Sequence, residues 1–129
     1  MALLRLGTCG AFQPPAHLGS AVVASPGSIF VRRDPDAFTL DAPGRPHYSI
    51  SLPVPSDPLL SSLVRQELEA RLGPEGVCAG LNVSADSFYS SQGRSTTLFD
   101  DRNANVIADV LAAYPGELAP TWAASRGAG

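Results

Sequence analysis

The stretch RLGTCGAFQP, from Arg5 to Pro14, decides the fold class, because it joins an apolar run to a tight turn rich in anion-binding groups. Residues 2–4 (ALL) predict a buried strand, and the glycines at positions 7 and 10 permit backbone conformations that side chains forbid. Arg5 can clamp an oxyanion through two parallel N–H bonds, and the Thr8 hydroxyl with nearby backbone N–H groups can complete a phosphate cradle. On these residues alone a strand ending in a glycine turn beside a solvated arginine is the simpler interpretation, since Gly-x-x-Gly turns are common.

The composition is that of an ordinary globular domain. The chain has 129 residues, of which 44% are hydrophobic and 16% charged, enough for one modest domain and outside the disordered class. The formal net charge of -3 provides no electrostatic footprint for DNA or RNA, so we expect no nucleic-acid polymer as a partner. All nine basic residues are arginine, so guanidinium groups would hold any bound phosphate, although genome base composition explains the bias more simply.

Neither the cysteines nor the apolar runs indicate a secreted or membrane protein. Cys9 and Cys78 lie far apart and lack metal-ligand spacing, so we expect neither a disulfide framework nor a metal site. Residues 1–6 are too short for a signal-peptide core, and no apolar run approaches transmembrane length. The sequence therefore predicts a soluble, cytoplasmic protein that binds no membrane.

Short β-rich runs predict the strands. Residues 21–24 and 28–31 predict two strands separated by a bend, and residues 48–52 alternate like a short edge strand. A further strand over 77–83 is apolar enough to be buried on both faces.

Two helices complete the expected elements. Ser56, Asp57 and Pro58 supply a capping side chain, an acid at the positive end of the dipole and a proline that needs no N–H, and leucines at helical spacing predict a helix over 57–72. A second helix is predicted over 102–113. The order of strands and helices indicates an α/β domain with a mixed sheet.

A second group of chemical side chains follows the predicted strand at 77–83. Residues 86–94 read DSFYSSQGR and place Phe88, Gln92 and Arg94 within a few positions of one another. An aromatic ring can pack on a planar base, a glutamine amide can donate and accept along its edge, and an arginine can donate to a carbonyl oxygen. On chemistry alone, a polar loop with two partly buried aromatics is supported equally well.

Taken together and in this order, the two segments resemble the uridine phosphorylases of the nucleoside phosphorylase superfamily. That family has a phosphate-binding Arg-(Ile/Leu)-Gly-Thr-x-Gly strand end, which RLGTCG at 5–10 matches, and a uracil-binding Asp-x-Phe-Tyr-x-x-Gln-x-Arg segment, which residues 86–94 match. The resemblance covers roughly residues 2–115, and the Gln-x-Arg pair is its more specific part because it separates pyrimidine-using from purine-using members. It implies an α/β fold with an incomplete nucleoside phosphorylase-type mixed β-sheet flanked by helices.

The resemblance assigns roles to six residues. Phosphate would be bound by Arg5, Thr8 and Gly10, and Thr8 would also approach the ribose. The base would be bound by Phe88, Gln92 and Arg94. The catalytic residues would be Arg5, Thr8 and Arg94.

The implied reaction is the cleavage of uridine by inorganic phosphate to uracil and ribose 1-phosphate, a step of pyrimidine nucleoside catabolism or salvage. Donors from Arg94 and Gln92 would stabilise the negative charge that grows on the departing base, and Arg5 would hold the nucleophile in line. Phosphate is a co-substrate, and no other cofactor and no metal are expected. Family enzymes are homo-oligomers with shared sites, so the implied partners are a nucleoside, phosphate and further copies of the chain.

The chain departs from the family at both ends. The family's upstream glycine-rich loop, and the His and Arg that reach into a neighbouring site, have no counterpart here, and we expect His17 and His47 to be surface residues. Downstream, ELAPTW at 117–122 replaces the family's ribose-binding Glu-Met-Glu, and Pro120 would disrupt the strand that carries it. We therefore expect a partial phosphorylase domain over 1–116 and a divergent, disordered tail over 117–129.

Two functions remain open for such a chain. The first is phosphorolysis of uridine or a related pyrimidine nucleoside; the sequence does not separate uridine from thymidine or deoxyuridine. The second is a catalytically inactive fragment with at most weak phosphate or base binding, because missing strands expose a sheet edge and deplete the core. An interaction module unrelated to nucleosides fits the composition but makes both motifs coincidental.

Overall fold

The computed structural model describes residues 1–11, 14–39, 43–116 and, for the backbone only, 121–124. The elements, in chain order, are β1 (Ala21–Val23), β2 (Ser28–Arg33), η1 (Pro35–Phe38), β3 (Tyr48–Ile50), α1 (Pro58–Leu72), η2 (Pro74–Gly76), β4 (Val77–Ala79), β5 (Asn82–Ala85), η3 (Ser90–Gln92), α2 (Val106–Ala113) and β6 (Thr121–Ala124).

The described strands form two sheets. β1 and β4 pair in parallel as a two-stranded sheet, and the second sheet has the order β3-β2-β5-β6. In this larger sheet β2 pairs in parallel with β5, and β5 with β6, whereas β3 is an antiparallel edge strand. The prediction of an α/β domain with a mixed sheet is confirmed, as are the strands expected near residues 21–24, 28–31 and 48–52.

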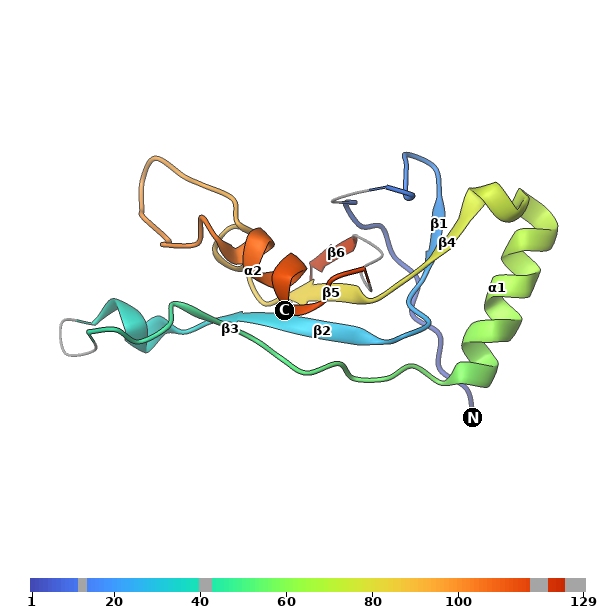
Figure 1. Ribbon diagram of the computed structural model, residues 1–129, viewed down its shortest axis with the longest axis horizontal. Helices are drawn as coiled ribbons and strands as arrows, with labels where there is room; N and C mark the ends of the chain where they lie inside the picture. The colour runs from blue at the N-terminus through green and yellow to red at the C-terminus, as the bar shows by residue number, and fades with distance from the viewer. Residues whose placement is uncertain (12–13, 40–42, 117–120, 125–129) are drawn as a thin grey trace.

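The core lies between the larger sheet and α2 (Figure 1). Alternate side chains of a strand point to the same face, so the central strands each direct two apolar side chains at the helix. The fully buried members are Ile29, Val31, Leu81, Val83, Val106 and Val110. Each buried aliphatic side chain stabilises the fold by roughly 1.5–3 kcal/mol. This packing fixes the end of β5, from which the predicted base-binding segment leaves the sheet.

Helix α1 stands at one end of the molecule, beside β1 and β4 (Figure 1). Asp57 is its N-cap, because its Oδ1 accepts a hydrogen bond from Leu60 N at 2.8 Å, and Pro58 follows in the first turn. The Ser56 hydroxyl does not cap the helix but donates to the Ala24 carbonyl at 2.6 Å. The helix ends where predicted, at Gly73, whose φ of 79° leaves the helical region. None of the α1 residues is fully buried.

Two expected strands differ from those observed. Residues 2–4 form no strand, and Leu3 is 86% exposed, because an apolar run becomes a strand only where a neighbour completes its hydrogen bonds. The single strand expected over 77–83 is divided at Gly80 and Leu81 into β4 and β5, which belong to different sheets. The Gly80 amide still donates to the Val23 carbonyl of β1 at 3.2 Å, just after the last β1–β4 pair, Val23 with Ala79.

The C-terminal region also differs from the prediction. Helix α2 begins at Val106 rather than at 102, since residues 101–103 take part in loop contacts described below. Residues 121–124, expected to lie in a disordered tail, form β6 and pair in parallel with β5, so Pro120 does not prevent a strand that starts after it. The rest of the predicted tail, residues 117–120 and 125–129, lies outside the described residues.

Candidate functional site

The predicted base-binding residues lie together in the loop that follows β5. The guanidinium carbon of Arg94 lies 4.2 Å from the centroid of the Phe88 ring, a cation–π stack. The Tyr89 ring meets Phe88 edge to face at 5.3 Å between centroids. Phe88 remains 52% exposed, so an aromatic face next to a cation is open to a ligand.

Gln92 brings an unused hydrogen-bond donor to the same group. Its Oε1 accepts from Arg94 Nε at 3.4 Å, whereas its Nε2 is buried and has no hydrogen-bond partner among the described residues. The residue as a whole is 4% exposed. An unsatisfied buried donor costs about 1–3 kcal/mol, so a ligand carbonyl that reached Nε2 would relieve that penalty.

The turn between Gln92 and Arg94 requires glycine. Gly93 has a φ of 67°, and a Cβ built on it would lie 2.9 Å from Val106 Cγ1 and 3.3 Å from Ile107 Cδ1. The start of α2 therefore packs directly against this turn. The glycine allows the loop to close on the helix while Gln92 points inward and Arg94 outward to the Phe88 ring.

We call residues 86–94 the base loop. Strand β2 and the loop before α2 hold it in place. Asp86 accepts from the Arg33 backbone N–H at 3.1 Å and from the Ser91 hydroxyl. Asp101 accepts from the Ser90 hydroxyl at 2.7 Å and pairs with Arg33 Nη2 at 3.4 Å.

Sequence reasoning missed Arg33 and the residues at 101–103. The available signal was the run DDRN at 100–103, a cluster of capping and turn residues that overlaps the start of the helix predicted over 102–113. Asn103, in that run, donates to three carbonyl oxygens of the base loop.

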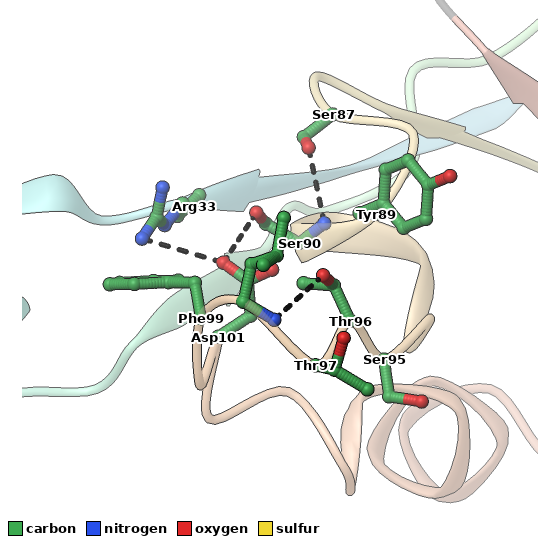
Figure 2. A pocket seen from close by; sticks show the side chains of 10 residues that line it. Arg33, Ser87, Tyr89, Ser90, Ser95, Thr96, Thr97, Phe99 and Asp101 are labelled. Carbon is green, nitrogen blue, oxygen red and sulfur yellow. Dashed lines mark hydrogen bonds and ion pairs between the residues drawn. The ribbon is translucent and has the colours of Figure 1, made fainter.

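A cavity of about 680 Å³ lies on the side of the loop where Arg33 is found. Figure 2 shows Arg33 and Ser90 directed at Asp101, with Tyr89 and the threonines at 96 and 97 around them. The guanidinium of Arg33 lies 4.2 Å from the Phe38 ring centroid and 5.1 Å from that of Phe99. Phe88, Gln92 and Arg94 do not line this cavity.

The predicted phosphate-binding residues occupy a different part of the molecule. Arg5 and Thr8 line a cavity of about 450 Å³ between the N-terminal segment, β1 and α1. Gly10 does not line it, and no described atom comes within 4 Å of the position of a Cβ at Gly10. The described residues thus bring Arg5 near Thr8 and group the three base residues, but no described cavity is lined by both groups.

In the described part of the chain, the cysteines, histidines and carboxylates form no disulfide or metal site. Cys9 and Cys78 are free, and burial together with the nearby Cys9 raises the pKa of the Cys78 thiol. Within the described ranges, no group of three or more His, Cys, Asp or Glu could hold a metal ion. No described helix has the length and apolar character needed to cross a membrane.

Two comparisons with known proteins found similarity to phosphorylases. One solved structure comes from a study of two diverse uridine phosphorylases of the oomycete Phytophthora capsici. Its chain is 39% identical to this one and superposes with a TM-score of 0.81 over 90% of this chain. The match spans 44% of the length of that solved chain. No curated protein sequence matches.

The family comparison covers most of the chain. A model described as the phosphorylase superfamily matches residues 1–113, a range that includes the Arg5–Thr8 segment, the base loop and all of the core helix α2. The chain therefore belongs to the phosphorylase superfamily.

Proposed function

We propose that this chain carries the base-binding part of a site that cleaves uridine with inorganic phosphate. The observation that carries the proposal is the buried Nε2 of Gln92, which has no hydrogen-bond partner in the described part of the chain, beside an arginine that stacks on Phe88. A uracil ring offers what this group lacks: a flat face for Phe88 and carbonyl oxygens for Gln92 and Arg94. The similarity to a solved uridine phosphorylase supports the choice of base.

In the proposed reaction a phosphate oxygen attacks C1′ of the ribose while the bond from C1′ to N1 of uracil breaks. The bonding electron pair leaves with the base, so negative charge spreads to its carbonyl oxygens as the bond lengthens. Donors aimed at these oxygens are worth more in the transition state than in the substrate, and this is the role of Arg94 and Gln92. Uracil then takes a proton, and the sugar leaves as ribose 1-phosphate.

Arg5 and Thr8 are the proposed phosphate ligands. A guanidinium can hold two phosphate oxygens through parallel N–H bonds, and the Thr8 hydroxyl can bind a third. Gly10 would offer its backbone N–H. Holding the nucleophile in line with C1′ lowers the entropic part of the barrier.

A second candidate is a superfamily member that binds the base without turning the nucleoside over. It is favoured by the separation of the two groups, since Arg5 and Thr8 line a described cavity that none of the base residues lines. The homo-oligomer implied by the resemblance and the cytoplasmic location predicted from the apolar runs remain predictions for either candidate.

The test measures phosphate-dependent release of uracil from uridine by the purified chain. We compare Arg94→Ala with Arg71→Ala, a matched control on α1 whose side chain is 76% exposed. We expect release by the wild type and the control and a loss of at least about a hundredfold in Arg94→Ala, because a charge-assisted contact to the leaving group is removed. Uracil binding without any release would favour the second candidate, and an active Arg94→Ala would refute the assigned role.

A further inference from the structure

One buried amide holds the loop that carries Gln92 and Arg94. Asn103 is 7% exposed and directs its Nδ2 at three backbone carbonyl oxygens, those of Tyr89, Ser90 and Arg94, each at 3.0 Å. An amide nitrogen has two hydrogens, so one of them is shared between two acceptors. The donor capacity of this side chain is used entirely on the base loop.

These three carbonyls lie on both sides of the turn that presents the base residues. The Tyr89 carbonyl also accepts from the backbone amides of Gln92 and Arg94, each at 3.2 Å. Asn103 therefore ties the entry of the turn, at Tyr89 and Ser90, to its exit at Arg94. The backbone between those points, which bears Gln92 and Gly93, is fixed at both ends.

The segment before α2 is bent in a way that delivers this amide. Arg102 has a φ of 47°, which is unfavourable for a residue with a Cβ. The Arg102 backbone N–H donates to Asp100 Oδ1 at 2.9 Å. At the start of α2, the Val106 backbone N–H donates to the Asn103 carbonyl at 3.1 Å. Such conformations persist where surrounding contacts determine them, and the three bonds from Asn103 are contacts of that kind.

We infer that Asn103 is a positioning residue for base recognition, which sets the backbone from which Gln92 and Arg94 reach a pyrimidine base. The inference rests on the proposed function. Asn103 acts through the loop, because its amide is directed at carbonyl oxygens and not at a ligand. Its loss should weaken base binding and spare phosphate binding, since Arg5 and Thr8 line a cavity beside α1 that neither Asn103 nor the base residues line.

The test compares Asn103→Ala with Asn105→Ala, a matched control two residues along that is exposed and makes no capping hydrogen bond. Uracil and inorganic phosphate are titrated separately by calorimetry. We expect Asn103→Ala to weaken uracil binding about tenfold or more and to leave phosphate binding unchanged, with Asn105→Ala like the wild type. Unchanged uracil affinity, or an equal loss for both ligands, would overturn the inference.

Amide hydrogen exchange supplies a readout that needs no ligand. In Asn103→Ala the amides of Gln92 and Arg94 should exchange faster while those of β5 keep their protection; equal changes in both places would indicate a general loss of structure and count against the inference. If Asn103→Ala does not fold, Asn103→Ser, whose hydroxyl can donate one bond, is judged by the same criteria. A wild type that binds no uracil would refute the proposed function, whereas the exchange comparison would still decide whether Asn103 holds the loop.

Discussion

Gly93 separates the two side chains that the proposed function places on the edge of the base. Its φ of 67° suits glycine, and a Cβ at this residue would lie only 2.9 Å from Val106 Cγ1, which is too close. Two costs therefore oppose any other residue at this position: backbone strain and a collision with the core helix.

We expect Gly93→Ala to destabilise the fold by about 2–3 kcal/mol, from strain of about 1 kcal/mol plus overpacking against α2. The control is Gly116→Ala, which has a similar φ of 76° but no atom of the described residues within 4 Å of the Cβ position. Urea unfolding followed by circular dichroism measures both variants. Equal losses in the two variants would show that the contact with Val106 contributes nothing.

At the scale of elements, two tyrosines join α2 to the edge strand β3 and the residue that follows it through hydrogen bonds. Tyr48, on β3, donates to Asp109 Oδ2 at 2.6 Å, and Tyr114, at the end of α2, donates to the Ser51 carbonyl at 2.8 Å. The edge strand and the helix that packs against the base loop are thus joined by polar contacts as well as by the core.

The Tyr48 contact makes stability depend on pH. Burial, assisted by the hydrogen bond to Asp109 and its charge, raises the pKa of Tyr48 from 10.0 to about 12. Because the folded state holds the phenol proton more tightly than the unfolded chain, this stabilisation is complete below pH 10 and is lost as the pH rises from about 10 to about 12. We expect the unfolding free energy of the wild type to fall through that range more steeply than that of Tyr48→Phe. Parallel pH profiles for the two proteins would contradict this account.

At the scale of the whole molecule, the predicted phosphate ligands and base ligands lie on separate structural units. Arg5 and Thr8 lie beside α1 and β1, whereas the base loop extends from the larger sheet and rests on α2. Substitutions in the two groups should therefore act independently.

We expect Arg5→Ala to weaken phosphate binding about ten- to a hundredfold and leave uracil affinity within about twofold, and Arg94→Ala to do the reverse. The double variant should show the sum of the two free-energy changes. Calorimetric titration of each ligand against the three variants checks this. A single substitution that weakened both ligands strongly would mean that the two groups form one coupled site.

The sequence predicts contacts between residues of one loop better than contacts between separate segments. The three base residues lie within seven positions of one another, so the sequence predicts that one loop carries them close together. The structure confirms this, because Arg94 contacts both Phe88 and Gln92. Arg33 reaches that loop from a strand 53 positions before Asp86, and Asn103 reaches it from the segment before α2, 9 to 14 positions after its partners. No pattern in the sequence states which loop either residue will contact. The roles assigned to the phosphate residues and to the base residues all remain predictions.

The sequence by itself determined the local features. Capping residues and prolines set the limits of α1, a β-rich run placed β2, and alternation placed β3, because these signals depend on neighbours a few positions away. Tertiary structure alone decided the features that depend on pairing: the division of residues 77–83 between two sheets, the addition of β6 beside β5, and the lack of a strand at residues 2–4. A strand exists only when a distant segment completes its hydrogen bonds, and which segment does so is settled by the packing of the whole chain.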